Sequence, residues 1–367
     1  MSKYKQATKN RFPEISVSGS PKDIGNNIGE EFRDSIKELS QKILDRHNKG
    51  SQKKITIQRA REIANSAIVF ARSFIPDAVE ELQATAESSG VSFEDIMLIN
   101  VRSMLSAPSG CTSVIIGSNI SKTGQGMIGQ NWDNDPEMAG FSAVITRHPI
   151  GKPSFITWCQ PGIIAYMGFN DKNIGICMNA LNGPTKQSGI GWYFLVRSIF
   201  EQNSTKAIIS LITKQQSAMS ANVALITEEG PLDLEITPDG TEILRASNDE
   251  TMVHTNHCVH PSLINNNKKY KSNIYGQSFA RFNRAEFLLK NIKSPISLED
   301  IKRILSDRQG YPTSINRYPN KDPETGWQRS VVSLIFEPKN NLMHLTKGNP
   351  GDNPYETYML KLSNSNQ

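Results

Sequence analysis

Cysteine is scarce in this sequence, and the few residues present lie far apart. A chain of 367 residues that depended on disulfides would need more cysteines, placed in closer groups. The composition therefore excludes a disulfide framework and indicates a reducing compartment. The four residues are Cys111, Cys159, Cys177 and Cys258.

Long apolar runs and blocks of like charge are also missing. No stretch approaches the roughly 18 apolar residues needed to span a bilayer, and the segment beginning at Met1 lacks the apolar core of a signal peptide. The net charge is only +5, and the basic residues are scattered along the chain. We therefore expect a cytoplasmic protein without a membrane segment and without a nucleic acid partner.

The front third of the sequence has the pattern of helices. Ser20–Asp23 combines an N-cap serine, a proline at the first helical position and an acid at the third, and apolar residues follow at helical spacing as far as Ile43. A second helical stretch covers about Thr56–Ser88 with a break at Pro76, and a third begins after Ser92. We predict that this third of the chain is nearly all helix.

From Cys111 onward the pattern changes to short strands. Runs such as Val114–Ile116 and Ala143–Thr146 are separated by glycine, proline, asparagine and aspartate, which predicts many antiparallel strands. Strand runs with helices segregated around them predict an α+β fold with sheets inside and helices outside. Later helical intervals are expected near residues 193–214, 279–289 and 298–305.

Cys111 follows a glycine at the start of the first strand-like run. If the Gly110–Cys111 peptide bond is cut, Cys111 carries a thiol and a free α-amine on one residue. An α-amine has an unperturbed pKa of about 7.7 to 8.0, so it can take the thiol proton near neutral pH. Gly110 allows the strained backbone in which the thiol reaches the preceding carbonyl. The alternative interpretation is that Cys111 is a small buried hydrophobic residue.

A second polar cluster, His254–His260, lies far downstream. A zinc site is not expected there, because a strand or tight turn would scatter these side chains and no second cysteine pair completes a tetrahedral site. Asn256 could instead donate an amide N–H to a developing oxyanion. The other interpretation is that these polar groups satisfy backbone groups at a strand end, and the residues alone favour it.

Three ordered motifs resemble a known family. Gly110–Ser113, Gly129–Asp133 and His254–His257 together resemble the acyl-coenzyme A:6-aminopenicillanic acid acyltransferase family of N-terminal nucleophile hydrolases, and the likeness spans most of the chain. The resemblance implies a four-layer αββα sandwich and a precursor that cuts itself before the cysteine. Residues 1–110 would then be a helical front piece, released or retained, and residues 111–367 the catalytic piece, together forming one domain.

The resemblance also implies roles for single residues. Cys111 becomes the nucleophile with its own α-amine as base, Asp133 orients or polarises that amine, and Asn256 forms the oxyanion hole. The family uses an arginine near the final strands, for which Arg329 is the candidate. A supporting role falls to two residues beside these, Thr112 and Asn131.

We therefore predict an autoprocessed amidohydrolase or acyltransferase that works through a thioester on Cys111. No cofactor or metal is expected. The expected partners are a small-molecule amide or acyl donor, acyl-coenzyme A included, and the second piece of a self-derived heterodimer. Two alternatives remain open: a papain-like thiol enzyme that sets His257 and Asn256 against Cys111, and a binding protein that keeps the sandwich without catalysis.

Overall fold

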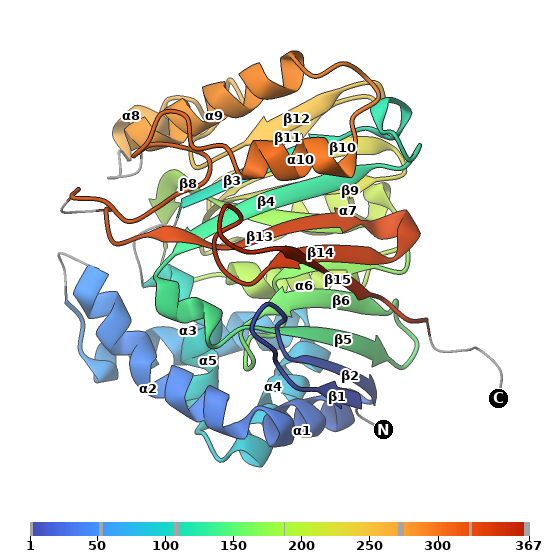
Figure 1. The fold of residues 1–367 in the computed structure, drawn as a ribbon. Coiled ribbons are helices and arrows are strands. Elements are labelled where there is room, and N and C mark those ends of the chain that lie inside the picture. The colour runs from blue at the N-terminus through green and yellow to red at the C-terminus, as the bar shows by residue number, and fades with distance from the viewer. Residues whose placement is uncertain are drawn as a thin grey trace.

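The computed structural model of the protein describes residues 3–50, 54–105, 110–186, 188–270, 275–322 and 325–362. Within these residues the chain forms β-sheets with helices packed outside them (Figure 1). The strands are β1 (Lys3–Lys5), β2 (Glu14–Gly19), β3 (Gly110–Ile116), β4 (Met127–Asn134), β5 (Ala143–Pro149), β6 (Phe155–Cys159), β7 (Met167–Asn170), β8 (Gly175–Thr185), β9 (Met219–Thr227), β10 (Gly230–Thr237), β11 (Gly240–Arg245), β12 (Thr251–His254), β13 (Arg329–Glu337), β14 (Leu342–Thr346) and β15 (Tyr355–Met359).

In the described part of the chain these strands form two sheets. The nine-stranded sheet has the order β1-β2-β5-β6-β7-β8-β9-β10-β11, and the six-stranded sheet has the order β12-β3-β4-β13-β14-β15. Neighbouring strands run antiparallel, as expected, except that β2 runs parallel to β5. The front of the chain therefore enters the larger sheet as a neighbour of a strand that comes after Cys111.

The helices begin and end mostly where local signals place them. Ser20 caps the first helix with a reciprocal capping box, Pro76 occupies the first turn of the fourth, and Gly90 ends that helix in the left-handed conformation. The helices are α1 (Pro21–Glu31), α2 (Arg33–Gly50), α3 (Ile57–Phe74), α4 (Pro76–Ser89), α5 (Phe93–Val101), α6 (Trp192–Phe200), α7 (Thr205–Ile212), α8 (Asn266–Lys269), α9 (Tyr275–Lys290) and α10 (Leu298–Leu305).

Two expectations for the front third are wrong. The stretch predicted as one helix through Ile43 is divided at Phe32, which leaves helical geometry and packs its ring edge-on against Tyr4 with ring centroids 5.9 Å apart. The front third is also not nearly all helix, because β1 and β2 belong to the larger sheet. The alternation of buried Ile15 and Val17 with more exposed neighbours is the period-two pattern of a strand.

Helices cover the outer face of each sheet. On the nine-stranded sheet α1 contacts β2 and β5, and α6 contacts β7 and β9. On the six-stranded sheet α9 contacts β3 and β12, and α10 contacts β4, while β3 and β4 contact β8 and β9 of the other sheet. Figure 1 shows α1 to α5 at one end of the molecule and α8 to α10 at the opposite end. The order helix, sheet, sheet, helix confirms the predicted α+β fold and its αββα layers.

The helices of the described residues give no support for a membrane span. None of them combines the length and the apolar composition that crossing a bilayer requires.

Candidate functional site

Cys111 is the second residue of β3, a strand inside the six-stranded sheet. It pairs directly with Trp132 of β4, and directly opposed residues of antiparallel strands carry their side chains on the same face. Cys111, Ile115 and Trp132 belong to the core between the sheets, whereas Val114 and Ile116 pack with residues of α9 and α10. The thiol therefore faces the other sheet, and Cys111 is only 1% exposed.

Asp133 lies on the opposite face of the same strand pair. It pairs with Gly110, and its Oδ1 accepts a hydrogen bond of 2.7 Å from Ser330 Oγ. Its Oδ2 is buried and has no hydrogen-bond partner among the described residues. A methyl group on Gly110 would lie 2.9 Å from that oxygen, so glycine is required here by space. Asp133 can reach the main chain around Gly110 and Cys111, but the strand separates it from the sulfur.

Two side chains hold the main chain of Cys111. Its N–H donates to Asn256 Oδ1 over 2.9 Å. Arg281 of α9 donates from Nη2 to the same Asn256 oxygen over 2.7 Å, and from Nη1 to the Cys111 carbonyl and, over 2.8 Å, to Thr112 Oγ1. Both sides of the Cys111 peptide unit are thus anchored by groups that lie more than a hundred residues away in sequence.

Arg317 brings a second guanidinium to the same place. It lies in the irregular segment between α10 and β13, where its main-chain N–H donates to Ser330 Oγ over 2.9 Å. Its Nη1 would lie 3.3 Å from a methyl group on Gly110, and neither Nη1 nor Nε has a hydrogen-bond partner among the described residues. Two buried guanidiniums therefore surround the one buried carboxylate of Asp133.

Burial dominates the protonation of this cluster. It raises the pKa of the Cys111 thiol to about 12, with the charge of Asp133 adding to the rise and that of Arg281 opposing it. Burial also raises the pKa of Asp133 against the pull of Arg281 and Arg317, and lowers the pKa of Arg281 to about 10. In the uncut chain the thiol is therefore protonated at neutral pH, while Arg281 is charged.

Asn256 is itself fixed from both ends. Its main-chain N–H donates to Ser278 Oγ over 2.8 Å, and its Nδ2 donates to the Ala180 carbonyl over 3.0 Å. The turn that carries it follows β12, whose last residue His254 pairs with the buried Glu235 at 2.8 Å. Asn256 therefore presents Oδ1 to the Cys111 nitrogen from a braced position.

The histidines and the cysteine of the turn after β12 face different partners. His257 Nδ1 lies 2.7 Å from Ser278 Oγ, and its ring stacks on Phe279 at 3.8 Å between centroids, while Cys258 Sγ contacts the Asn182 carbonyl. Among the described residues no group of three His, Cys, Asp or Glu side chains is arranged to hold a metal ion. The papain-like alternative gains no support either, because His257 is bound to a hydroxyl group on α9.

The buried His257 is expected to weaken the fold in acid. Burial, with the charges of His254 and Arg281, lowers the pKa of His257 to about 3, far below the value of about 6.5 for an unfolded histidine. Between these values the unfolded chain binds a proton that the native chain excludes, so the free energy of unfolding falls by about 1.4 kcal/mol for each pH unit of acidification. Urea unfolding of wild type and His257→Gln at about pH 7, 6 and 5 measures this, and equal slopes for both proteins contradict it.

The other candidate residues lie at different distances from the cluster. Thr112 belongs to it through Arg281. Asn131 pairs with Thr112 across the strands, and its Nδ2 donates to the carbonyls of Leu305 and Ile315, so it ties β4 to α10 and the segment after it. The structure does not bring Arg329 to Cys111: its Nη2 lies 3.5 Å from Asp352 Oδ2 at a partly exposed position. Ser109, before the scissile bond, lies outside the described residues.

Sequence reasoning missed Arg281 and Arg317. Arg281 carried a usable signal, because Ser278, Ala285 and Leu289 are the other buried positions of α9 and the helical period puts Arg281 on the same face. A charged residue on the apolar face of a helix is a candidate for a buried role. Arg317 carried no such signal, because no periodicity relates its irregular segment to a face of the fold.

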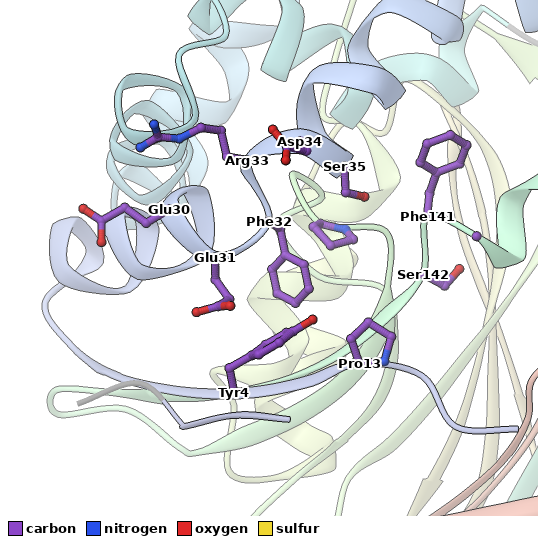
Figure 2. A pocket seen from close by; sticks show the side chains of 12 residues that line it. Tyr4, Pro13, Glu30, Glu31, Phe32, Arg33, Asp34, Ser35, Phe141 and Ser142 are labelled. Carbon is purple, nitrogen blue, oxygen red and sulfur yellow. The ribbon is translucent and has the colours of Figure 1, made fainter. Parts of the chain in front are cut away.

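A cavity of about 470 Å³ lies apart from this cluster (Figure 2). It is bounded by the junction of α1 with α2 and by the segment before β5, and Figure 2 shows the rings of Tyr4 and Phe32 beside the carboxylate of Glu31. Asp34 and Phe141 belong to the same lining. None of the residues described around Cys111 lines this cavity. The cavity and the buried cysteine cluster are therefore two separate sites.

The layers and the cluster together define a class of protein. The αββα sandwich is the fold that the resemblance to N-terminal nucleophile hydrolases implied, and a buried cysteine lies near the start of a strand in its six-stranded sheet. The arginine that binds the main chain of this cysteine is Arg281 and not the candidate Arg329. The family model described as acyl-coenzyme A:6-aminopenicillanic acid acyl-transferase matches residues 121–352. Because the match covers more than half of the 367 residues, the chain belongs to this acyltransferase family.

Individual proteins give further matches. The acyl-coenzyme A:6-aminopenicillanic-acid-acyltransferase 40 kDa form of Emericella nidulans is 24% identical over 361 residues, which are 95% of this chain and 96% of that protein. A mutant of the conjugated bile acid hydrolase from Clostridium perfringens is 12% identical, with a TM-score of 0.45 over 70% of this chain and all of that one. Penicillin V acylase from Agrobacterium tumefaciens is 11% identical, with a TM-score of 0.43 over 64% of this chain and 82% of that one.

Proposed function

We propose that the protein is a self-cleaving cysteine enzyme that hydrolyses an amide or transfers an acyl group through a thioester on Cys111. The observation that carries this proposal is the arrangement of the Cys111 peptide unit. Its N–H and its carbonyl are both held by buried side chains, Asn256 and Arg281, while Gly110 on the other side of the bond has no side chain. The contacts are concentrated on the residue that must stay in place when the bond before it breaks.

Self-cleavage would begin with attack of Cys111 Sγ on the carbonyl carbon of Gly110. The bond from that carbon to the Cys111 nitrogen breaks, the thiol proton passes to the nitrogen, and Gly110 becomes a thioester of Cys111. Water then releases the carboxylate of Gly110 and returns the thiol. These two reaction steps need no external oxidant or cofactor, and they leave Cys111 with a free α-amine.

The freed amine supplies what the buried thiol lacks. Burial raises the pKa of the Cys111 thiol to about 12, so at neutral pH the thiol needs a base beside it. The α-amine, with an ordinary pKa of about 7.7 to 8.0, stands on the same residue. Asp133 pairs with Gly110 across the strands and is the proposed residue that orients this amine, and Asn256 Nδ2 is the candidate donor to the oxyanion. Turnover then passes an acyl group to Sγ and on to water or to an amine.

Aromatic side chains suggest what kind of acyl group this is. Trp132 lies directly opposite Cys111, and its ring contacts those of Trp158 and Tyr166 at 5.3 and 6.1 Å between centroids. Burial raises the pKa of Tyr166, and the nearby Tyr193 and Cys111 add to the rise. Such a wall favours a flat, apolar acyl group, carried by an amide or by a thioester such as acyl-coenzyme A.

The front piece, residues 1–110, is proposed to stay bound as one half of a heterodimer. It supplies β1 and β2 to the larger sheet and α1 to α5 to the layer outside it. Glu81 of α4 is 1% exposed and pairs with Arg147 of β5 and Arg197 of α6, both from the piece after the cut. Release would expose these charges and the apolar surface around them.

Intact-mass analysis of the purified full chain tests the proposal. We expect two species, residues 1–110 and residues 111–367, with the second beginning at a free cysteine. Incubation with aromatic acyl amides or acyl-coenzyme A is expected to add an acyl group to the second species, and hydroxylamine is expected to remove it. An uncut chain that nevertheless shows full activity would contradict self-cleavage, and an unreactive Cys111 would favour the binding-protein alternative.

A further inference from the structure

We infer that Arg281 is a positioning residue for self-cleavage, which holds the nucleophile side of the scissile bond through three oxygen atoms at once. This inference rests on the proposed self-cleavage. The three acceptors are the Cys111 carbonyl, Thr112 Oγ1 and Asn256 Oδ1. The last of them also accepts the N–H of the bond that is to break. Arg281 therefore restrains Cys111 on both sides of its Cα, at the carbonyl directly and at the N–H through Asn256.

The chemistry of a guanidinium suits this task. It is planar and can only donate, so its contact with Asn256 decides which way that carboxamide faces. Oδ1 must lie toward Arg281 and the Cys111 nitrogen, and Nδ2 must lie on the other side, where it meets the Ala180 carbonyl. Without Arg281 the carboxamide loses one of the two donors that fix this orientation. A rotated Asn256 would present N–H groups to the scissile nitrogen, which has no acceptor to offer them.

The position of Arg281 also restrains Cys111 and Thr112 while leaving Gly110 able to move. Arg281 is 1% exposed on the buried face of α9, which packs on β3 and β12, so its backbone is fixed by the fold. Gly110 has no side chain through which Arg281 could hold it. Attack on the Gly110 carbonyl requires that residue to shift toward the sulfur, and the restraint on Cys111 and Thr112 directs the motion to the glycine.

The charge of Arg281 acts on the sulfur as well. Charged or titratable groups on both faces of the sheet act on the Cys111 thiol. Asp133 of β4 and Arg281 of α9 act from the outer face, and Tyr166 before β7 and Cys177 of β8 act from the core between the sheets. Arg281 is the one cation among these that favours the thiolate. Removing its charge should therefore move the pH at which self-cleavage accelerates to a higher value, whereas a residue that merely fills space would leave that pH unchanged.

Self-cleavage itself provides the assay, because its substrate is known. Wild type, Arg281→Lys and Arg281→Met are produced as full chains by cell-free translation, and the loss of the uncut chain is followed by intact mass between about pH 6 and 9. Arg284→Met is the matched control, since Arg284 lies one turn further along α9 and pairs with Asp307 outside the cluster. Thermal melting of each uncut chain reports whether it has folded.

The variants separate the two effects of Arg281. Arg281→Met is expected to slow self-cleavage at neutral pH by about 100-fold or more, with its acceleration moved up by about one pH unit. Arg281→Lys keeps the charge but cannot bind three oxygens in a plane, so it should cut about 10-fold more slowly with the pH dependence of wild type. Arg284→Met should cut like wild type.

Several results would overturn the inference. It is wrong if Arg281→Met cuts as fast as wild type, or if both variants slow in proportion to lost melting temperature with no change in pH dependence. If Arg281→Met does not fold, Arg281→Lys decides: slower cutting at an unchanged pH supports the inference, and cutting at the wild-type rate refutes it. A wild-type chain that never cuts refutes the proposed function instead, and this outcome is visible before any variant is made.

Discussion

Replacing Cys111 with alanine is expected to leave a single uncut chain and to lower the rate of acyl transfer or amide hydrolysis by about 10⁵-fold or more. One atom has two tasks in the proposed mechanism, since Sγ attacks the Gly110 carbonyl during maturation and the substrate carbonyl during turnover. Alanine removes the sulfur from a position that is 1% exposed, and leaves the N–H bond to Asn256 and the carbonyl bond from Arg281 in place. The fold should therefore survive while both reactions stop.

A second buried cysteine provides the matched control. Cys258 is also 1% exposed, and its Sγ makes one hydrogen bond of 3.4 Å to the Asn182 carbonyl. Cys258→Ala loses a thiol of similar burial, and the chain should still be cut and active. Intact mass and the hydrolysis rate of an aromatic acyl amide measure both variants. Two species from Cys111→Ala, or retained activity in that variant, would rule out Cys111 as the nucleophile.

Local signals in the sequence predicted the elements that flank the site. The capping residues before α1 and the proline that starts α4 fix helix boundaries within a few neighbouring residues, so they can be recognised without the fold. The strands around Cys111 could be predicted for the same reason. The parallel contact of β2 with β5 could not, because it joins residues about 130 positions apart that share no local pattern.

In the candidate site, too, some residues could be predicted from the sequence and others depend on tertiary contacts. Cys111, Asp133 and Asn256 were selected by motifs and by resemblance, and β3, β4 and the turn after β12 bring them close together. The arginine that sequence reasoning selected, Arg329, lies beside Asp352 and does not contact Cys111. Arg329 was chosen for its place before a final strand, but the strand directs Ser330 toward Asp133 and leaves Arg329 beside Asp352. Arg317 reaches the cluster through an irregular segment, whose course depends on tertiary contacts alone.

The two proposed pieces meet in a buried ion cluster that is independent of the cysteine. Glu81 lies 2.8 Å from Arg147 Nε and 2.6 Å from Arg197 Nη1, and all three side chains are 1% exposed. Burial alone would raise the pKa of Glu81, but the charges of Arg197 and Arg147 outweigh it and lower that pKa. This pairing stabilises the fold above the pKa of an unfolded glutamate, and the contribution is lost as the pH falls through the lower native value.

Glu81→Gln is therefore expected to lower the free energy of unfolding by about 3 to 5 kcal/mol at neutral pH. Glutamine keeps the shape but leaves Arg147 buried without a carboxylate, whereas Arg197 retains Glu201 at 3.1 Å. Glu62→Gln is the control, since Glu62 pairs with Arg59 at an exposed position and should change stability by less than about 1 kcal/mol. Urea unfolding measures both variants, and size-exclusion chromatography of the cut protein in urea shows when residues 1–110 separate. If the cluster joins the pieces, Glu81→Gln must release the front piece at a lower urea concentration than Glu62→Gln, and equal release would show that the apolar interface alone holds them together.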